Sequence, residues 1–218
     1  MGPFLLLWAL LCIAAASPEA EPTAVFPLQF SANLEITSHL IDNDSEYPPK
    51  TRRMTIYFDY EARKARADIE AGYEAAKIYI RRYDSNREYM VRLPPIDDCK
   101  RSYLGETMPF PDISFARFVK VQTVHDVLCN YFIIEEEDET TRIHIYMRAD
   151  TNEPVRLLEE SFDKGVSTAL LSYDFSDFIL TAPSADWFEL PEGLEHGTCD
   201  RHVGGFPYLH IFHHFVKF

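Results

Sequence analysis

The sequence predicts a mainly β (α+β) fold in which an antiparallel sheet places one face on an apolar core. Three observations predict it. Apolar and polar residues alternate in several segments, the apolar residues of each segment fall on one face, and short polar turns separate the segments. The chain has 16 Phe, 12 Tyr and 2 Trp against 8 Gly. Large rings on several strands can fill a packed core or line a pocket, and composition alone favours the packed core.

The first strand is expected at residues 28–36, because every second residue there is apolar. Two β-hairpins follow over residues 53–70 and 75–93, with polar turns at 61–64 and 84–87. Each hairpin is expected to present one apolar face.

The stretch YMVRLPPIDDCKRSYL, which spans residues 89–104, is typical of a strand that runs out into a charged loop. Pro94 and Pro95 end the strand, and Cys99 falls in the loop. The cysteine nearest to Cys99 in the sequence is Cys129.

The second half of the chain continues the β pattern. Strands are expected at residues 130–135, 142–147, 155–162 and 166–178. Short connections between nine or so strands imply antiparallel neighbours. Helices have little room, and the candidates are Ser114–Val119 and Ala185–Phe188.

Residues 1–16 predict a secretory signal peptide, and residues 17–218 predict a single secreted domain. Phe4–Ala16 is uncharged and apolar, ends in small residues, and is followed by acidic and proline-containing sequence. This run is shorter than the ~20 residues that cross a bilayer, so no membrane span is expected. About 200 residues remain, which is enough for one sizeable core.

Removal of Cys12 with the signal peptide leaves Cys99, Cys129 and Cys199. The oxidising secretory route predicts a disulfide, and three cysteines leave one thiol unpaired. The sequence alone allows three possible pairings. Asn43 opens an Asn-Asp-Ser sequon and predicts glycosylation of the secreted chain.

Composition and motifs exclude several function classes. The net charge of −14 disfavours nucleic acids and anionic membranes as partners. The sequence has no GxSxG, HExxH, P-loop or GxGxxG motif, so we expect no enzyme and no cofactor. Cys129 opens an expected strand and lacks the electropositive surroundings of a catalytic thiol.

Three segments raise further questions about metals and partners. The acidic run 135–139 is a weak candidate for calcium, against the simpler interpretation of a solvated hairpin tip. No metal site is predicted from the histidines near the end of the chain, which are His202, His210, His213 and His214. His210 and His214 would share one face of an extended strand, but no third ligand is apparent. Residues 204–218 are aromatic on both faces, which indicates a buried strand, an insertion into a cavity mouth, or a homodimer contact.

Four stretches together resemble a known family. They are MTIYFDYEARKARADI, REYMVRLPPIDDCKRSYL, RIHIYMRADTNEPVRLLEESF and DFSDFILTAPSADWFELPEGLEHGTC. In this order they are similar to the ependymin-related proteins and, more broadly, to the LolA-like lipoprotein-carrier fold. They also resemble the N-terminal domain of proteins like counting factor associated protein D. The resemblance spans residues 26–200.

The resemblance implies a strongly curved antiparallel sheet, or half-open barrel, with short helices or loops as a lid over an apolar cavity. It also implies a disulfide between Cys99 and Cys199, because the family joins the cysteine after the mid-chain strand to the one after the last strand. Cys129 is then left without a partner, and a buried free thiol is preferred to an intermolecular link.

The apolar-face residues are the candidates for lining this cavity, although core packing is the simpler interpretation for each. They are Leu34, Ile36, Ile56, Phe58, Ile78, Ile80, Tyr89, Val91, Ile143, Ile145, Leu171 and Tyr173. The predicted function is a secreted, non-enzymatic protein that binds a lipid or another hydrophobic small molecule. The alternative is an extracellular structural or protein-interaction module with a vestigial pocket.

Overall fold

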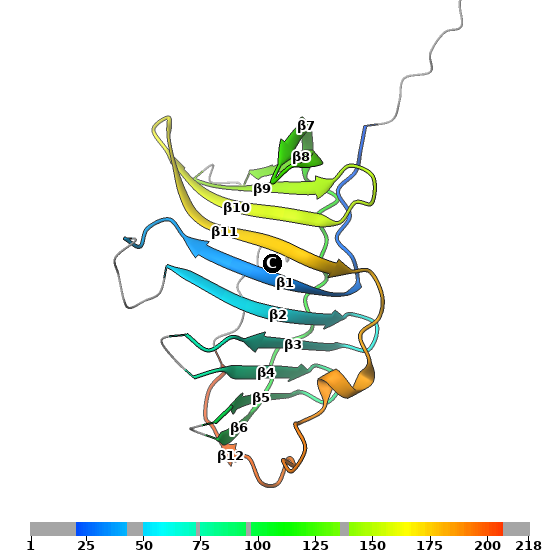
Figure 1. Ribbon diagram of the computed structural model, residues 1–218, viewed down its shortest axis with the longest axis vertical. Coiled ribbons are helices and arrows are strands. Elements are labelled where there is room, and N and C mark those ends of the chain that lie inside the picture. The colour runs from blue at the N-terminus through cyan, green and yellow to red at the C-terminus, as the bar shows by residue number, and fades with distance from the viewer. Residues whose placement is uncertain (1–20, 43–49, 73–74, 95–96, 136–139, 207–218) are drawn as a thin grey trace, which may run out of the picture.

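The computed structural model describes residues 21–42, 50–72, 75–94, 97–135 and 140–206 (Figure 1). In this part of the chain twelve strands form one sheet that does not close on itself, and its edge strands are β12 and β7. The strands are β1 (Gln29–Ser38), β2 (Thr51–Asp59), β3 (Lys64–Ile69), β4 (Lys77–Arg82), β5 (Arg87–Arg92), β6 (Asp98–Tyr103), β7 (Arg117–Val124), β8 (Val127–Glu135), β9 (Thr141–Arg148), β10 (Pro154–Asp163), β11 (Val166–Ile179) and β12 (Asp200–Arg201). The predicted mainly β, antiparallel architecture is confirmed.

The strand order, β12-β6-β5-β4-β3-β2-β1-β11-β10-β9-β8-β7, consists of two meanders that meet at β1 and β11. All neighbours are antiparallel except β12, which pairs in parallel with β6. The link from β6 to β7 therefore joins the two ends of the sheet. We call this link, residues 104–116, the strap.

Tight turns close two of the hairpins. Lys164 and Gly165 between β10 and β11 both have positive φ, 50° and 81°. His125 and Asp126 between β7 and β8 do the same, at 48° and 62°. Two consecutive positive φ values are typical of the two-residue turns whose twist matches that of antiparallel strands. Such turns fix the register of both hairpins.

The sheet curves towards the strap. Ten strand spacings of about 4.8 Å separate β6 from β7, which is about 48 Å along a flat sheet. Fourteen residue steps from Tyr103 to Arg117 reach that length only when fully extended, at up to ~3.6 Å each. The strap instead turns twice, where Asp112 N donates to Phe110 O and Ala116 N donates to Ile113 O. The face that the strap crosses is therefore concave, and Figure 1 shows the strap behind the sheet.

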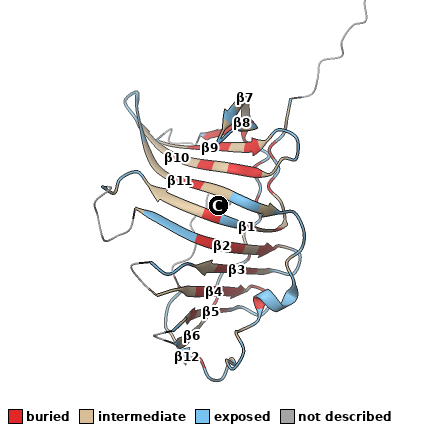
Figure 2. Cartoon of the chain, viewed as in Figure 1, coloured by how far each residue is buried: buried red, intermediate tan, exposed pale blue. Residues whose placement is uncertain are grey.

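We call this concave side the inner face and the opposite side the outer face. Buried residues run across the middle of the strands, whereas turns and strand ends are mostly intermediate or exposed (Figure 2). The outer face carries η1 (Ala185–Phe188), a four-residue 3-10 helix that contacts β3 and β4. Within the described ranges, no helix has the length and apolar character needed to cross a membrane.

Two expectations about helices are corrected. The helix predicted at Ser114–Val119 is wrong: the chain makes one turn that ends at Ala116, and β7 then begins at Arg117. The helix predicted at Ala185–Phe188 is present as η1, but it lies on the outer face, because Trp187 stacks on Tyr57 there. In the described part of the chain no helical lid covers the inner face.

The loop predicted around Cys99 is also corrected. Residues 98–103 form β6, which pairs with β5 so that Cys99 lies opposite Val91. The charged residues that suggested a loop are instead ordered by pairing: Arg92 donates to both carboxylate oxygens of Asp98, at 2.8 and 2.7 Å. A strand this polar forms because it is held between β5 and β12.

Candidate functional site

The centre of the inner face is built by β1 and β2. Phe30 lies opposite Phe58, and Leu34 lies opposite Met54. All four side chains are buried, because alternation turns every second residue of both strands towards the same side. The Phe30 ring stacks on the rings of Phe58 and Phe178, with centroids 5.6 and 4.9 Å apart. The central strands thus give the inner face an apolar, largely aromatic surface. We call this surface the floor.

Strands β9, β10 and β11 extend the same floor. Ile145 lies opposite Leu157, and Leu157 lies opposite Tyr173 in turn. These residues are buried in one cluster with Phe30. A continuous apolar surface therefore crosses the inner face over two meanders.

The strap covers this floor. Leu104, Met108, Ile113 and Ala116 are buried in the same cluster. Among the described residues, the strap's backbone from residue 105 to 114 makes no backbone–backbone hydrogen bond to another part of the chain; its bonds are local, within the two turns and from Ser114 N to Asp112 Oδ1. Arg81 Nη1 also donates to the Glu106 carboxylate. The cover is therefore attached by side chains, unlike a sheet strand.

One polar pair lies on the apolar floor. The Tyr173 hydroxyl donates to Glu159 Oε1 at 2.5 Å, and both residues are buried. Burial raises the pKa of Tyr173, and the Glu159 carboxylate raises it further, so the hydroxyl stays protonated and remains a donor. Ile36 lies opposite Tyr173, and Leu171 lies opposite Glu159; both are only partly buried. Apolar surface that is not fully covered thus surrounds this pair.

The twelve predicted lining residues do not share one face, and this part of the hypothesis is corrected. Eight lie on the inner face: Leu34, Ile36, Ile56, Phe58, Ile143, Ile145, Leu171 and Tyr173. Four lie on the outer face in a separate cluster: Ile78, Ile80, Tyr89 and Val91. The role of the eight inner residues in ligand binding stays a prediction.

The switch of face comes from register. Ala65 and Ala67 of β3 belong to the inner cluster, and their partners on β4 are Arg81 and Tyr79. Ile78 and Ile80, which alternate with those positions, must then point outwards. The sequence pattern hides this, because Ile78, Tyr79 and Ile80 are apolar in succession.

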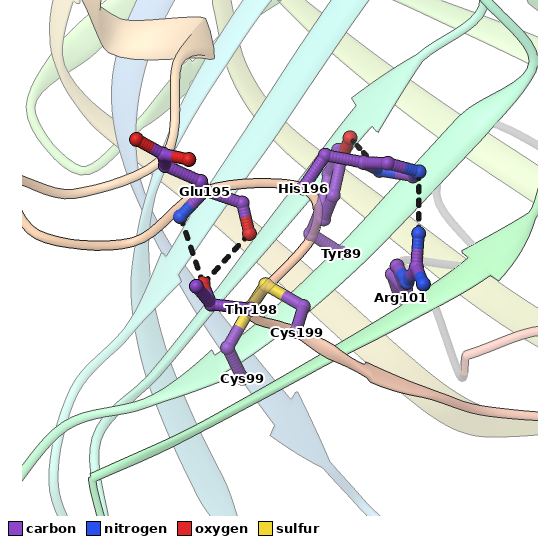
Figure 3. The surroundings of a disulfide bond; sticks show 7 residues. All are labelled: Tyr89, Cys99, Arg101, Glu195, His196, Thr198 and Cys199. Carbon is purple, nitrogen blue, oxygen red and sulfur yellow. Dashed lines mark hydrogen bonds between the residues drawn. A yellow bond between two sulfur atoms is a disulfide. The ribbon is translucent and has the colours of Figure 1, made fainter.

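A disulfide holds the chain over the outer cluster. Cys99 of β6 is bonded to Cys199, across a sequence separation of 100 residues (Figure 3). This is the pairing that the family resemblance implies. Leu190 and Leu194 pack against the cluster beneath the bond. We call residues 188–199 the return segment.

Sequence reasoning missed a buried ion pair at the β4–β5 end of the inner face. Arg81 Nε lies 3.4 Å from Glu88 Oε2, and Phe206 N donates to Glu88 Oε1 at 3.1 Å. Burial raises the pKa of Glu88 against the attraction of Arg81. The sequence contained evidence for this ion pair, because two opposite charges, Arg81 and Glu88, face each other across the predicted 75–93 hairpin.

The remaining candidates stand as follows. Cys129 is a free thiol with no exposed surface, and burial raises its pKa. Among the described residues, no three His, Cys, Asp or Glu side chains gather as metal ligands. The signal peptide, Asn43, residues 136–139 of the acidic run and residues 207–218 lie outside the described residues, so the predictions about secretion, glycosylation, calcium and the end of the chain stay predictions.

Comparison with known proteins gives a fold and no family. No protein-family model and no curated protein matches the chain. An uncharacterized conserved protein from Thermus thermophilus is similar in structure, with 10% identity over 80% of this chain and 90% of that chain and a TM-score of 0.51. At this identity the likeness shows a shared fold alone.

Two further solved structures are similar at lower scores. MucB in complex with MucA(peri) matches with 15% identity over 75% of this chain, which spans 54% of MucB, at a TM-score of 0.45. A domain from Vibrio parahaemolyticus that is named for outer membrane lipoprotein sorting matches with 12% identity over 78% of this chain and 88% of that domain, at a TM-score of 0.31. Neither score carries an argument about this chain. A domain named for lipoprotein sorting is thus among the structural neighbours, whereas a LolA-like fold and a relation to ependymins stay predictions.

Proposed function

We propose that this protein is a secreted, non-enzymatic carrier that binds a lipid or another hydrophobic small molecule on its inner face. One observation carries the proposal: an apolar, concave floor is covered by a strap in which residues 105–114 form no backbone–backbone hydrogen bond with the described sheet. Burial of an apolar ligand on such a floor stabilises the complex by roughly 25 cal/mol per Å². The sequence resemblance to lipoprotein carriers points to the same use.

The attachment of the strap supports its exchange for a ligand. Lifting a strand from a sheet would break a ladder of backbone hydrogen bonds, each worth about 1 kcal/mol. Lifting the strap exposes side chains such as Met108 and Ile113 and separates the Arg81–Glu106 ion pair, which is partly exposed to water. An acyl chain on the floor would replace the apolar contacts that Met108 and Ile113 lose.

The buried Tyr173–Glu159 pair supports a ligand with one polar group. Apolar sites usually contain a few polar atoms that fix the orientation of the ligand. The Glu159 carboxylate can accept a hydrogen bond from a hydroxyl or amide, and the partly buried Ile36 and Leu171 beside it mark where the ligand would enter. An uncharged polar group therefore fits this position better than an anion.

Secretion is supported by the disulfide, since such bonds persist in oxidising compartments and are rare in the cytosol. It is further supported by the sequence of residues 1–16.

Binding of a fluorescent fatty-alcohol probe, which has an apolar chain and an uncharged head, to the secreted protein tests the proposal. Leu171→Asp places a charge on the inner face and should abolish probe binding. Val166→Asp makes the same change on the same strand at a side chain that is 65% exposed, and should leave binding unchanged. Urea unfolding of both variants checks that they fold. No saturable binding to the wild type, or equal binding by both variants, would contradict the proposal.

The strap also favours a second candidate, an extracellular interaction module whose inner face is permanently filled. Four strap residues already occupy the floor. Native mass spectrometry of the protein purified from its source separates the two functions. A carrier should retain an extractable lipid, whereas an interaction module should show none and should form a stable complex with another protein. The same spectra report whether the predicted homodimer forms.

A further inference from the structure

A cavity lies on the outer face, away from the site proposed above. It has a volume of about 360 Å³ and lies between strands β4 and β5 and the return segment. Arg82, Arg87 and Tyr89 line the strand side. Leu190, Leu194 and His196 line the opposite side. Its volume falls within the range of small-molecule sites, about 300–1,000 Å³.

Two arginines face each other at this cavity. Arg82 and Arg87 are directly opposite on β4 and β5, and like charges in this position destabilise a sheet unless they are neutralised. Arg82 is neutralised, since Nη1 donates to Glu189 Oε1 at 2.9 Å and Nη2 donates to Asp84 Oδ2 at 2.9 Å. The Arg87 side chain is exposed and has no hydrogen bond or ion pair with any described residue.

A third arginine, Arg101, contacts the cavity wall and has no acidic partner among the described residues. Arg101 lies opposite Tyr89 on β6 and donates from Nη1 to His196 Nε2 at 2.6 Å. Its Nε is buried and has no hydrogen-bond partner among the described residues. Two guanidinium groups, those of Arg87 and Arg101, thus lack a described carboxylate partner in a chain whose net charge is −14. In so acidic a protein, a cationic patch without acidic partners favours an anionic ligand.

The hydrogen bonds of His196 fix the donors on this wall. Arginine donates only, so Nε2 of His196 accepts, and its proton resides on Nδ1. Nδ1 lies 2.9 Å from the Tyr89 hydroxyl and donates to it. The hydroxyl proton of Tyr89 is therefore left to donate elsewhere. Burial and the charges of Arg101 and Arg87 lower the pKa of His196, which agrees with a neutral ring.

The acidic groups of the cavity do not oppose an anion at this wall. Glu189 is engaged by Arg82 and by Lys64, whose Nζ lies 3.8 Å from Oε1. Figure 3 shows the Glu195 carboxylate directed away from His196 and Tyr89. The wall around Arg87 and Tyr89 therefore presents donors, while Leu190 and Leu194 present apolar surface across from them.

We propose that the outer cavity binds a small amphiphilic carboxylate, with its head on Arg87 and the Tyr89 hydroxyl and its apolar part on Leu190 and Leu194. A guanidinium and a carboxylate match each other in a bidentate geometry, which favours a carboxylate head. This site is independent of the inner face, which offers the Glu159 carboxylate to an uncharged polar group.

Calorimetric titration of the disulfide-bonded protein with octanoate tests the proposal. Octanoate should bind saturably, and octanol, which has the same chain without the charge, should bind at least about tenfold more weakly. Arg87→Gln should weaken octanoate by about tenfold or more, and Tyr89→Phe should weaken it by several fold. Arg117→Gln removes the same charge from an exposed arginine of β7, at the opposite end of the sheet from the cavity, and should change nothing.

Several results would overturn the proposal. One is a titration of octanoate without saturable heat. Another is octanoate binding to Arg87→Gln as tight as to the wild type, which would place the ligand elsewhere. Equal affinity for octanol would remove the role of the head group, and tighter binding of octyl phosphate than of octanoate would overturn the choice of a carboxylate. Because Arg87 is exposed, Arg87→Gln should keep the urea midpoint of the wild type, so that a lost affinity reports on the site.

Discussion

Removal of the disulfide by Cys99→Ala and Cys199→Ala together is the most direct test of how the outer cluster is held. The bond joins β6 to the end of the return segment, over a cluster of only six buried residues. Without it, the return segment is held by Leu190 and Leu194 and by surface ion pairs such as Arg82–Glu189. Such pairs contribute little, typically 0 to about 1 kcal/mol.

The magnitude follows from the size of the closed loop. For the 100-residue separation, the chain-entropy treatment gives a loss of about 4.7 kcal/mol in the free energy of unfolding. Domains of this kind have about 5–15 kcal/mol in total, so the double variant should lose a large part of its stability. The inner cluster, which the bond does not touch, should keep its packing.

Urea unfolding monitored by Trp fluorescence measures this loss. Cys129→Ala is the matched control, because it removes a buried thiol that forms no bond, and it should cost about 1 kcal/mol. A double variant that loses less than about 1 kcal/mol with an unchanged urea slope would refute the reasoning. So would peptide mass spectrometry of the wild type that finds Cys99 joined to Cys129.

Three further outcomes are expected. Phe30→Ala should lower the free energy of unfolding by about 3–5 kcal/mol in urea titrations, because the ring is fully buried among other rings; a loss under about 1 kcal/mol would contradict an aromatic floor. Burial alone would raise the pKa of Asp174, but hydrogen bonds from Arg156 and His125 outweigh it and lower that pKa. The unfolded chain therefore binds a proton on Asp174 at a higher pH than the folded chain does. The stability that the ionised Asp174 contributes is fully present above the pKa of the unfolded state and is lost as the pH falls through the lower pKa of the folded state. Asp174→Asn should flatten the acid limb of a plot of stability against pH, and an unchanged slope would count against the pairing. In hydrogen exchange, amides 105–111 should exchange much faster than those of β1 and β2; equal protection would contradict a strap held by side chains.

Local chemistry allowed much of the fold to be predicted. The hairpin over residues 53–70 is β2 and β3, and the strand expected at 166–178 is β11. Both predictions rest on alternation and on turn residues, which act over a few positions along the chain. The candidates on β1, β2, β9 and β11 share the inner face for the same reason.

The remaining errors arise where a distant segment decides the local structure. Ile113 and Ala116 have helical spacing, yet they serve as two contacts of the strap on a floor made by strands far along the chain. The sequence of β6 is polar and typical of a loop, and it is ordered by its pairing with β5 and β12. β12 and the strands under the strap lie far from these residues in the sequence, so periodicity within a short window could not reveal these partners.

The change of face at β4 explains why the disulfide lies where it does. Arg81 and Glu88 take inner-face positions on β4 and β5, so the apolar residues of these strands must be covered from outside. The sheet therefore has two cores on opposite faces, and the outer one is too small to retain its cover by apolar contacts alone. A covalent bond from β6 to the return segment supplies that retention. The same bond holds His196 against Tyr89 and Arg101, so the outer cavity should depend on the disulfide, whereas the inner floor should not.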